Sequence, residues 1–228
     1  MSTSEENQET TSDNTTSAAD NTWHERPDAD KIPCPALLTF YNNGLLNPDK
    51  HGNVATNQLN DVLAGVGISA DVRKTLVKGA DETDEIPDSF NLFALHDSKL
   101  DHTGSIGIRD PHFNPDKLEN VLLRFSEKGR MSAEHFAAAA NYARREDPGL
   151  KGTIIETLEL TALLEVFGRV DESTKKRYLT VDDVKGLWND GKLPKGWQAR
   201  PANDIGVDDV IAGVTEMAVK RLLQLFGI

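Results

Sequence analysis

The sequence predicts a mainly α-helical fold, and two observations support this expectation. Apolar residues recur at helical spacing through most of the chain after Trp23, whereas the period-two alternation of half-buried strands is rare. Residues that cap helices also stand at the right places: Asn114 precedes Pro115, and Thr180 stands directly before a valine and two aspartates. We therefore expect a single-domain helical bundle.

Nine segments show this helical pattern, and no fixed-period repeat or interior linker separates them into groups. The expected helices cover 35–43, 55–66, 69–79, 89–97, 115–127, 132–145, 151–167, 180–190 and 207–226. Residues 23–228 are accordingly expected to form one domain. Residues 1–22 are rich in Ser, Thr, Asn and Glu without apolar periodicity, and we expect them to form a disordered tail because they cannot offset their ordering entropy.

The overall composition argues against several classes of partner. A net charge of −12 and a pI near 4.9 argue against nucleic acid or an anionic membrane surface as the main partner. No apolar run approaches the roughly 20 residues of a membrane helix, and the first thirty residues lack the features of a secretory signal. With one cysteine, an intracellular location is the simplest expectation; a secreted one would apply to a chain trimmed of its leader.

The only cysteine, Cys34, stands between Pro33 and Pro35 and directly before an apolar run. The prolines fix their own φ angles, so the sequence predicts a stiff segment with Cys34 at the start of a short helix. A sulfur at a helix N-terminus meets the positive end of the dipole, which favours the thiolate. Thiolates attack electrophiles or bind soft metals and haem iron; a buried cysteine acting as a small hydrophobe is the alternative.

A polar turn follows the expected helix at 89–97. It is dense in Asp, His, Ser and Gly and includes Asp101, His102 and Ser105, so it is suited to wrapping a cation. Reading the turn as an EF-hand loop, with Gly104 as the invariant glycine, puts Lys99 at the first ligand position. A positively charged side chain in place of a calcium-binding carboxylate argues against a calcium sensor.

The expected helix at 151–167 carries two candidate acidic residues. Glu159 has apolar residues at its i+3, i+4 and i+7 positions, so its side chain is expected to face the core. A buried carboxylate costs several kcal/mol unless it is hydrogen-bonded, paired or protonated, which makes a functional role the favoured explanation. Glu156 lies about 60° away around the helix and is the rival candidate.

Several segments together resemble one known family. The run PCPALLTFYNNGLL at 33–46 looks like the opening of the haem-thiolate peroxidases, the family that contains chloroperoxidase and the unspecific peroxygenases. The segment 100–106 resembles that family's Glu-His-Asp motif followed by Ser, and 131–146 and 179–201 resemble its middle helix and its later Leu-Pro and Gly-Trp segment. The resemblance spans roughly 32–201.

The resemblance implies a helical domain enclosing haem b, which uses H₂O₂ to oxidise or oxygenate a small organic substrate. It implies that Cys34 is the axial ligand of the haem iron and Glu159 the distal acid-base that handles peroxide. His102 would orient Glu159. Asp101, the His102 carbonyl and Ser105 would hold a Mg²⁺ ion beside a haem propionate.

Two departures from the family pattern support an alternative. The family's Glu is Asp101 here, and its following Asp is Thr103, which removes a charged partner of His102. The alternative is a catalytically silent haem-binding or interaction module of the same fold. A nucleophilic cysteine paired with histidine is a third hypothesis, but no local sequence signature favours it.

The remaining histidines and the last helix receive simpler interpretations. We expect His24 and His51 to be solvated, His96 and His112 to flank the polar turn, and His135 to pack within its helix. The helix at 207–226 is amphipathic and is expected to pack on the core. Its alternative role is a homodimer surface, formed by Ile211, Val214, Met217, Leu222 and Phe226.

Overall fold

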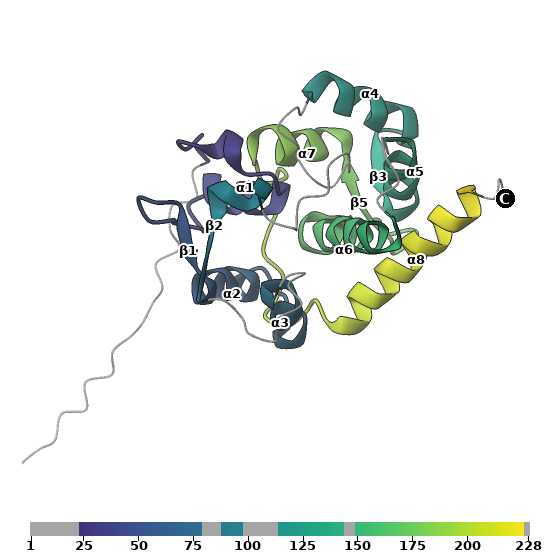
Figure 1. Cartoon of the computed structure of the whole chain (residues 1–228). Coiled ribbons are helices and arrows are strands. Elements are labelled where there is room, and N and C mark those ends of the chain that lie inside the picture. Colours follow the sequence, from purple (N-terminus) through teal and green to yellow (C-terminus); the bar gives the residue numbers. More distant parts are fainter. Residues whose placement is uncertain (1–22, 79–87, 98–113, 144–148, 226–228) are drawn as a thin grey trace, which may run out of the picture.

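The computed structural model describes residues 23–78, 88–97, 114–143 and 149–225, and these are mostly helical, with two small sheets (Figure 1). The predicted mainly α class is confirmed. The expected tail at 1–22 lies outside the described residues. Within the described ranges, no helix combines the length and apolar character that crossing a bilayer requires.

The N-terminal part builds a small two-stranded sheet between short helices. Its elements are η1 (Ala29–Lys31), α1 (Pro35–Asn42), β1 (Asn53–Ala55), α2 (Thr56–Gly65), α3 (Ala70–Lys78), β2 (Ser89–Asn91) and the 3₁₀ helix η2 (Leu92–Asp97). Strands β1 and β2 pair antiparallel, with Val54 opposite Phe90. The prediction of a helix at 89–97 is therefore wrong for residues 89–91, which form β2. Three residues are too few to show an apolar period, and β2 forms because it pairs with β1.

The C-terminal part is longer and holds the second sheet. Its elements are α4 (Pro115–Phe125), β3 (Arg130–Ser132), α5 (Ala133–Ala143), α6 (Gly149–Phe167), β4 (Arg169–Val170), β5 (Arg177–Thr180), α7 (Val181–Lys185), the π-helix η3 (Gly186–Asp190) and α8 (Val207–Leu225). The strands lie in the order β3-β5-β4, all antiparallel, and Met131 faces Leu179 across the first pair. Both of these side chains are fully buried, which ties the sheet to the core.

The capping residues behave largely as the sequence predicts. The Asn114 side chain accepts a hydrogen bond from the Lys117 backbone N–H at 3.0 Å, at the start of α4. Thr180 and Asp183 form a reciprocal capping box at the start of α7. At α5 the backbone N–H of Ser132 donates to His135 Nδ1 at 3.1 Å, so His135 has a capping role in addition to its place on the helix.

One hydrophobic cluster joins the two parts of the chain. Its largest fully buried side chains include Phe40 from α1, Phe136 from α5, Phe167 from α6 and Trp188 from η3. Helix α8 runs diagonally along one side of the molecule and packs against α5 and α6 (Figure 1). Helix α6 therefore has one side against the core and another against α8.

The apolar residues of α8 that were expected to form a dimer surface differ in their exposure to solvent. Met217 is fully buried in the core, whereas Ile211 is 57% exposed and Val214 is intermediate. Met217 is therefore not part of an exposed stripe, because α8 turns that side toward α5 and α6. The Leu222 side chain and Phe226 lie outside the described residues.

Candidate functional site

Cys34 is the N-cap residue of α1, with Pro35 in the first turn of the helix. The residue is of intermediate exposure, but its sulfur is desolvated, and this burial raises the pKa of the thiol to about 11. The negative charge of Glu159 is the next largest cause and acts in the same direction. The backbone amides of Leu37 and Ala36 lower the pKa, as expected for a helix start, but burial and Glu159 outweigh them. The helix N-terminus alone therefore does not make Cys34 a thiolate, contrary to the sequence-based expectation.

The influence of Glu159 on Cys34 places the two predicted residues in one region of the fold. Glu159 lies on α6, is of intermediate exposure, and has its Oε2 atom shielded from solvent. Electrostatic interactions weaken with distance and solvent screening, so a carboxylate that perturbs a buried thiol must lie near it. The fold thus brings together a thiol from α1 and a carboxylate from α6, which are far apart in the sequence.

The rival residue, Glu156, belongs to a buried ion pair. Its Oε2 lies 2.7 Å from Nη2 of Arg221 on α8, and the two side chains are 5% and 3% exposed. Arg221 also donates to Thr157 Oγ1 at 3.2 Å and, through Nε, to Asn141 Oδ1 at 3.1 Å. Glu156 therefore has a structural role that links α6 to α8, which leaves Glu159 as the better candidate for chemistry.

The polar turn lies outside the described residues. Asp101, His102, Thr103, Ser105 and His112 all belong to 98–113. The proposed Mg²⁺ ligands and the orienting histidine therefore stay predictions. Among the residues that are described, no group of three or more His, Cys, Asp or Glu side chains is placed to hold a metal ion.

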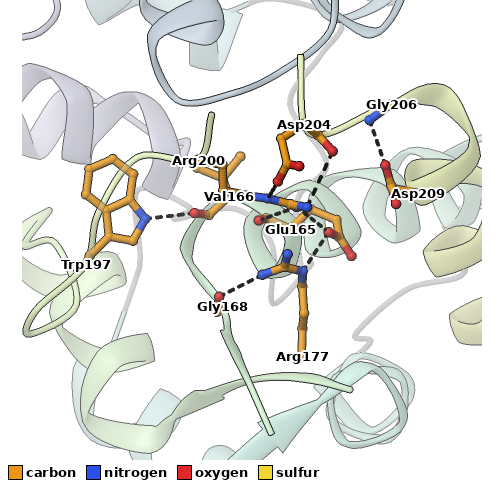
Figure 2. Close-up of polar contacts among 9 residues, drawn as sticks. All are labelled: Glu165, Val166, Gly168, Arg177, Trp197, Arg200, Asp204, Gly206 and Asp209. Atoms are coloured by element: carbon orange, nitrogen blue, oxygen red, sulfur yellow. Dashed lines mark hydrogen bonds and ion pairs between the residues drawn. The ribbon is translucent and has the colours of Figure 1, made fainter. Parts of the chain in front are cut away.

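A cluster of long side chains fixes the C-terminal end of α6, and the sequence analysis did not identify it. Oε2 of Glu165 lies 2.8 Å from both Arg177 Nε and Arg200 Nη1 (Figure 2). These two arginines come from β5 and from the segment before α8. We call Glu165, Arg177, Arg200 and Trp197 the α6 clamp.

The α6 clamp also occupies main-chain carbonyls that a helix end leaves without intrahelical partners. Arg177 Nη1 donates to the Gly168 carbonyl at 3.1 Å, and Trp197 Nε1 donates to the Val166 carbonyl at 2.8 Å (Figure 2). These contacts fix the end of the helix that carries Glu159. The only sequence signal was the family-like segment at 179–201, which contains Trp197 and Arg200.

The π-helix η3 is a second feature that the sequence did not predict, and it packs against α1. Asn42 and Asn43, at the end of α1, donate to the carbonyls of Asp190 at 2.7 Å and Gly191 at 3.0 Å. Gly191 has a φ of +62°, and a Cβ there would lie 2.8 Å from Leu38 Cγ. Glycine is required where η3 approaches α1 this closely, and the contact holds α1, the helix that Cys34 caps, against the core.

The other described histidines take no part in this region. His24 and His51 are exposed, in agreement with the prediction that they are solvated. The His96 side chain lies outside the described residues.

Comparison of the sequence with models of known protein families and with curated proteins gave no match.

Proposed function

We propose that this chain is a haem-thiolate peroxidase or peroxygenase that uses H₂O₂ to oxidise or oxygenate a small organic substrate. One feature carries the proposal: the charge of Glu159, which the family resemblance assigns to acid-base chemistry, raises the pKa of Cys34, which it assigns to iron ligation. Neither the helical periodicity nor the composition of the chain required this proximity. The bundle is proposed to enclose haem b beside α1 and α6.

The surroundings of Cys34 fit axial ligation of haem iron. The sulfur is desolvated, lies at the start of a helix and receives a favourable contribution from two backbone amides. Backbone dipoles near a ligating sulfur are one way in which proteins tune thiolate-bound iron. A pKa of about 11 describes the free thiol, and metal coordination favours the deprotonated ligand with release of a proton.

Glu159 is proposed to hold and transfer a proton. Bound haem would supply the redox-active iron at which a hydroperoxide is cleaved. The Glu159 carboxylate would take a proton from one peroxide oxygen and return it to the other, as general acid-base catalysis requires. His102 is proposed to orient Glu159, and Asp101 and Ser105 to bind Mg²⁺.

The proposal is tested by H₂O₂ consumption in protein produced with a haem precursor in the medium. Glu159→Gln keeps the side-chain shape but loses the proton transfer, so the rate should fall about 100-fold while haem content and fold are retained. His102→Ala should reduce the rate less, because a histidine that only orients the base is less important than the base. Wild-type activity in Glu159→Gln would contradict the assignment.

The alternative function is a catalytically silent haem-binding or interaction module of the same fold. It is favoured by Asp101 and Thr103 at positions where the family has Glu and Asp. Under this alternative, the wild-type protein binds haem but consumes H₂O₂ no faster than Glu159→Gln.

A further inference from the structure

A cavity of about 370 Å³ lies on the other side of α6 from Glu159, between α6, the β4–β5 hairpin and α8. Its apolar lining includes Leu164, Val170 and Met217. Neither Cys34 nor Glu159 contributes to it. Its volume lies within the range of small-molecule sites. Figure 2 shows four of its charged lining residues: Glu165, Arg177, Arg200 and Asp209.

Two hydrogen-bond donors in the lining are not used by the described part of the protein. Thr161 is only 2% exposed, and its hydroxyl has no hydrogen-bond partner among the described residues. Arg177 uses Nε for Glu165 and Nη1 for the Gly168 carbonyl, and its Nη2 makes no hydrogen bond within the same ranges. Buried polar groups are rarely left unpaired, so the Thr161 hydroxyl in the cavity wall indicates a ligand.

The charges around the cavity are balanced and do not favour a dianion. Four cationic and three anionic side chains line it, and two of the cations also pair with carboxylates outside the lining: Lys175 with Glu172 at 2.7 Å and Arg200 with Asp204 at 2.5 Å. The carboxylates already have partners: Glu165 has two arginines, Glu216 lies 2.9 Å from Lys176 Nζ, and Asp209 accepts the Gly206 N–H at 2.8 Å. The lining therefore holds no excess of positive charge to balance a doubly charged phosphate, whereas the unused Nη2 of Arg177 can bind a single carboxylate.

We propose that this cavity binds a small organic monocarboxylate with an apolar body. The carboxylate accepts hydrogen bonds from Arg177 Nη2 and the Thr161 hydroxyl, since guanidinium groups bind carboxylates through directed, charge-assisted hydrogen bonds. The apolar body lies against Leu164, Val170 and Met217. The site is separate from the proposed peroxide chemistry, and it stands whether or not that function is correct.

Isothermal titration calorimetry on the full-length protein tests the proposal with three probes: benzoate, its neutral analogue benzamide, and inorganic phosphate. Benzoate should bind with a Kd of about 1 mM or tighter. Benzamide and phosphate should each bind at least about tenfold more weakly, because the first lacks the charge and the second lacks the apolar body.

Three variants locate the binding. Ala212 is exposed and lines the cavity, so Ala212→Phe should block it and weaken benzoate binding at least about tenfold. Thr161→Val keeps the shape without the hydroxyl and should also weaken binding. Thr215→Phe, at an exposed position of α8 outside the lining, is the control and should bind as wild type does.

Binding is compared only among variants that circular dichroism melting has shown to be folded. Loss of benzoate binding in Ala212→Phe, with binding retained in Thr215→Phe, would support the site. No binding of benzoate, equal binding of benzamide, equal binding of phosphate, or unchanged binding in Ala212→Phe would each overturn it.

Discussion

Glu156 and Glu159 are two residues of one type on one helix, and their surroundings give them different roles. Glu156 is buried against Arg221, with the two charged groups 2.7 Å apart and almost no solvent access. Glu159 is less buried and acts electrostatically on Cys34. Removing one partner of a buried ion pair is strongly destabilising, because the other charge stays buried without compensation.

Glu156→Gln should therefore lower the free energy of unfolding by about 3 kcal/mol, since Arg221 would lose its counter-charge. Denaturant unfolding followed by circular dichroism measures this change. Glu159→Gln is the matched control on the same helix and should change the stability by less than about 1 kcal/mol. Equal losses of stability in the two variants would show that their roles are not distinct.

The proximity of Cys34 and Glu159 has its own test in the protein without haem. Removing the Glu159 charge should lower the pKa of the Cys34 thiol from about 11, because a neighbouring negative charge disfavours the thiolate. In Glu159→Gln the rate of alkylation by iodoacetamide should thus begin to rise at a lower pH than in wild type. Cys34 is the only cysteine, so mass spectrometry follows it alone.

In the same experiment, Glu156→Gln should leave the pH profile of alkylation unchanged, since Glu156 is not among the groups that shift the Cys34 pKa. A shift in Glu156→Gln, or none in Glu159→Gln, would contradict the arrangement of α1 and α6.

At the scale of elements, α6 and α8 approach each other closely at one glycine. A Cβ added at Gly213 would lie 2.5 Å from Thr161 Cγ2, inside van der Waals contact. Glycine costs about 1 kcal/mol of helix propensity relative to alanine, so its place within α8 is explained by packing. This contact also accounts for part of the burial of Thr161, which is 2% exposed.

Gly213→Ala should destabilise the protein by about 1 kcal/mol, because overpacking costs about 1–3 kcal/mol and the propensity gain recovers only part of it. Adding Thr161→Ser, which removes the clashing methyl group, should recover the loss. Gly65→Ala is the control: nothing lies within 4 Å of its added Cβ, so it should be neutral or stabilising. A Gly213→Ala variant as stable as Gly65→Ala would show that the helices do not approach this closely.

The elements that local sequence determines were largely predictable. Asn114 before Pro115 and Thr180 three residues before Asp183 mark helix starts through contacts within one turn, and the structure has both caps. Strand β2 was missed because its identity depends on β1, about 36 residues earlier in the chain. The π-helix η3 was missed because its packing on α1 depends on Asn42, which is far away in the sequence.

Across the whole molecule, the residues of the candidate site stay predictions from the resemblance, and their surroundings were not predictable from the sequence. The resemblance nominated Cys34 and Glu159, and in the fold the charge of Glu159 raises the pKa of Cys34. The α6 clamp joins residues from three segments, and no periodicity links Glu165 to Arg177 and Arg200. Such long-range partners depend on how the helices pack, which sequence patterns within one element do not specify.

The most direct test of the whole account is the absorption spectrum of the reduced carbon monoxide complex, recorded on protein produced with a haem precursor. If Cys34 ligates haem iron, the Soret band should be red-shifted as thiolate ligation requires, and Cys34→Ala should lose this shift. Glu159→Gln should keep it, because Glu159 is proposed to act on peroxide and not on the iron ligand. A wild-type protein that takes up no haem under any loading condition, or a Cys34→Ala variant with an unchanged Soret band, would contradict the proposed function.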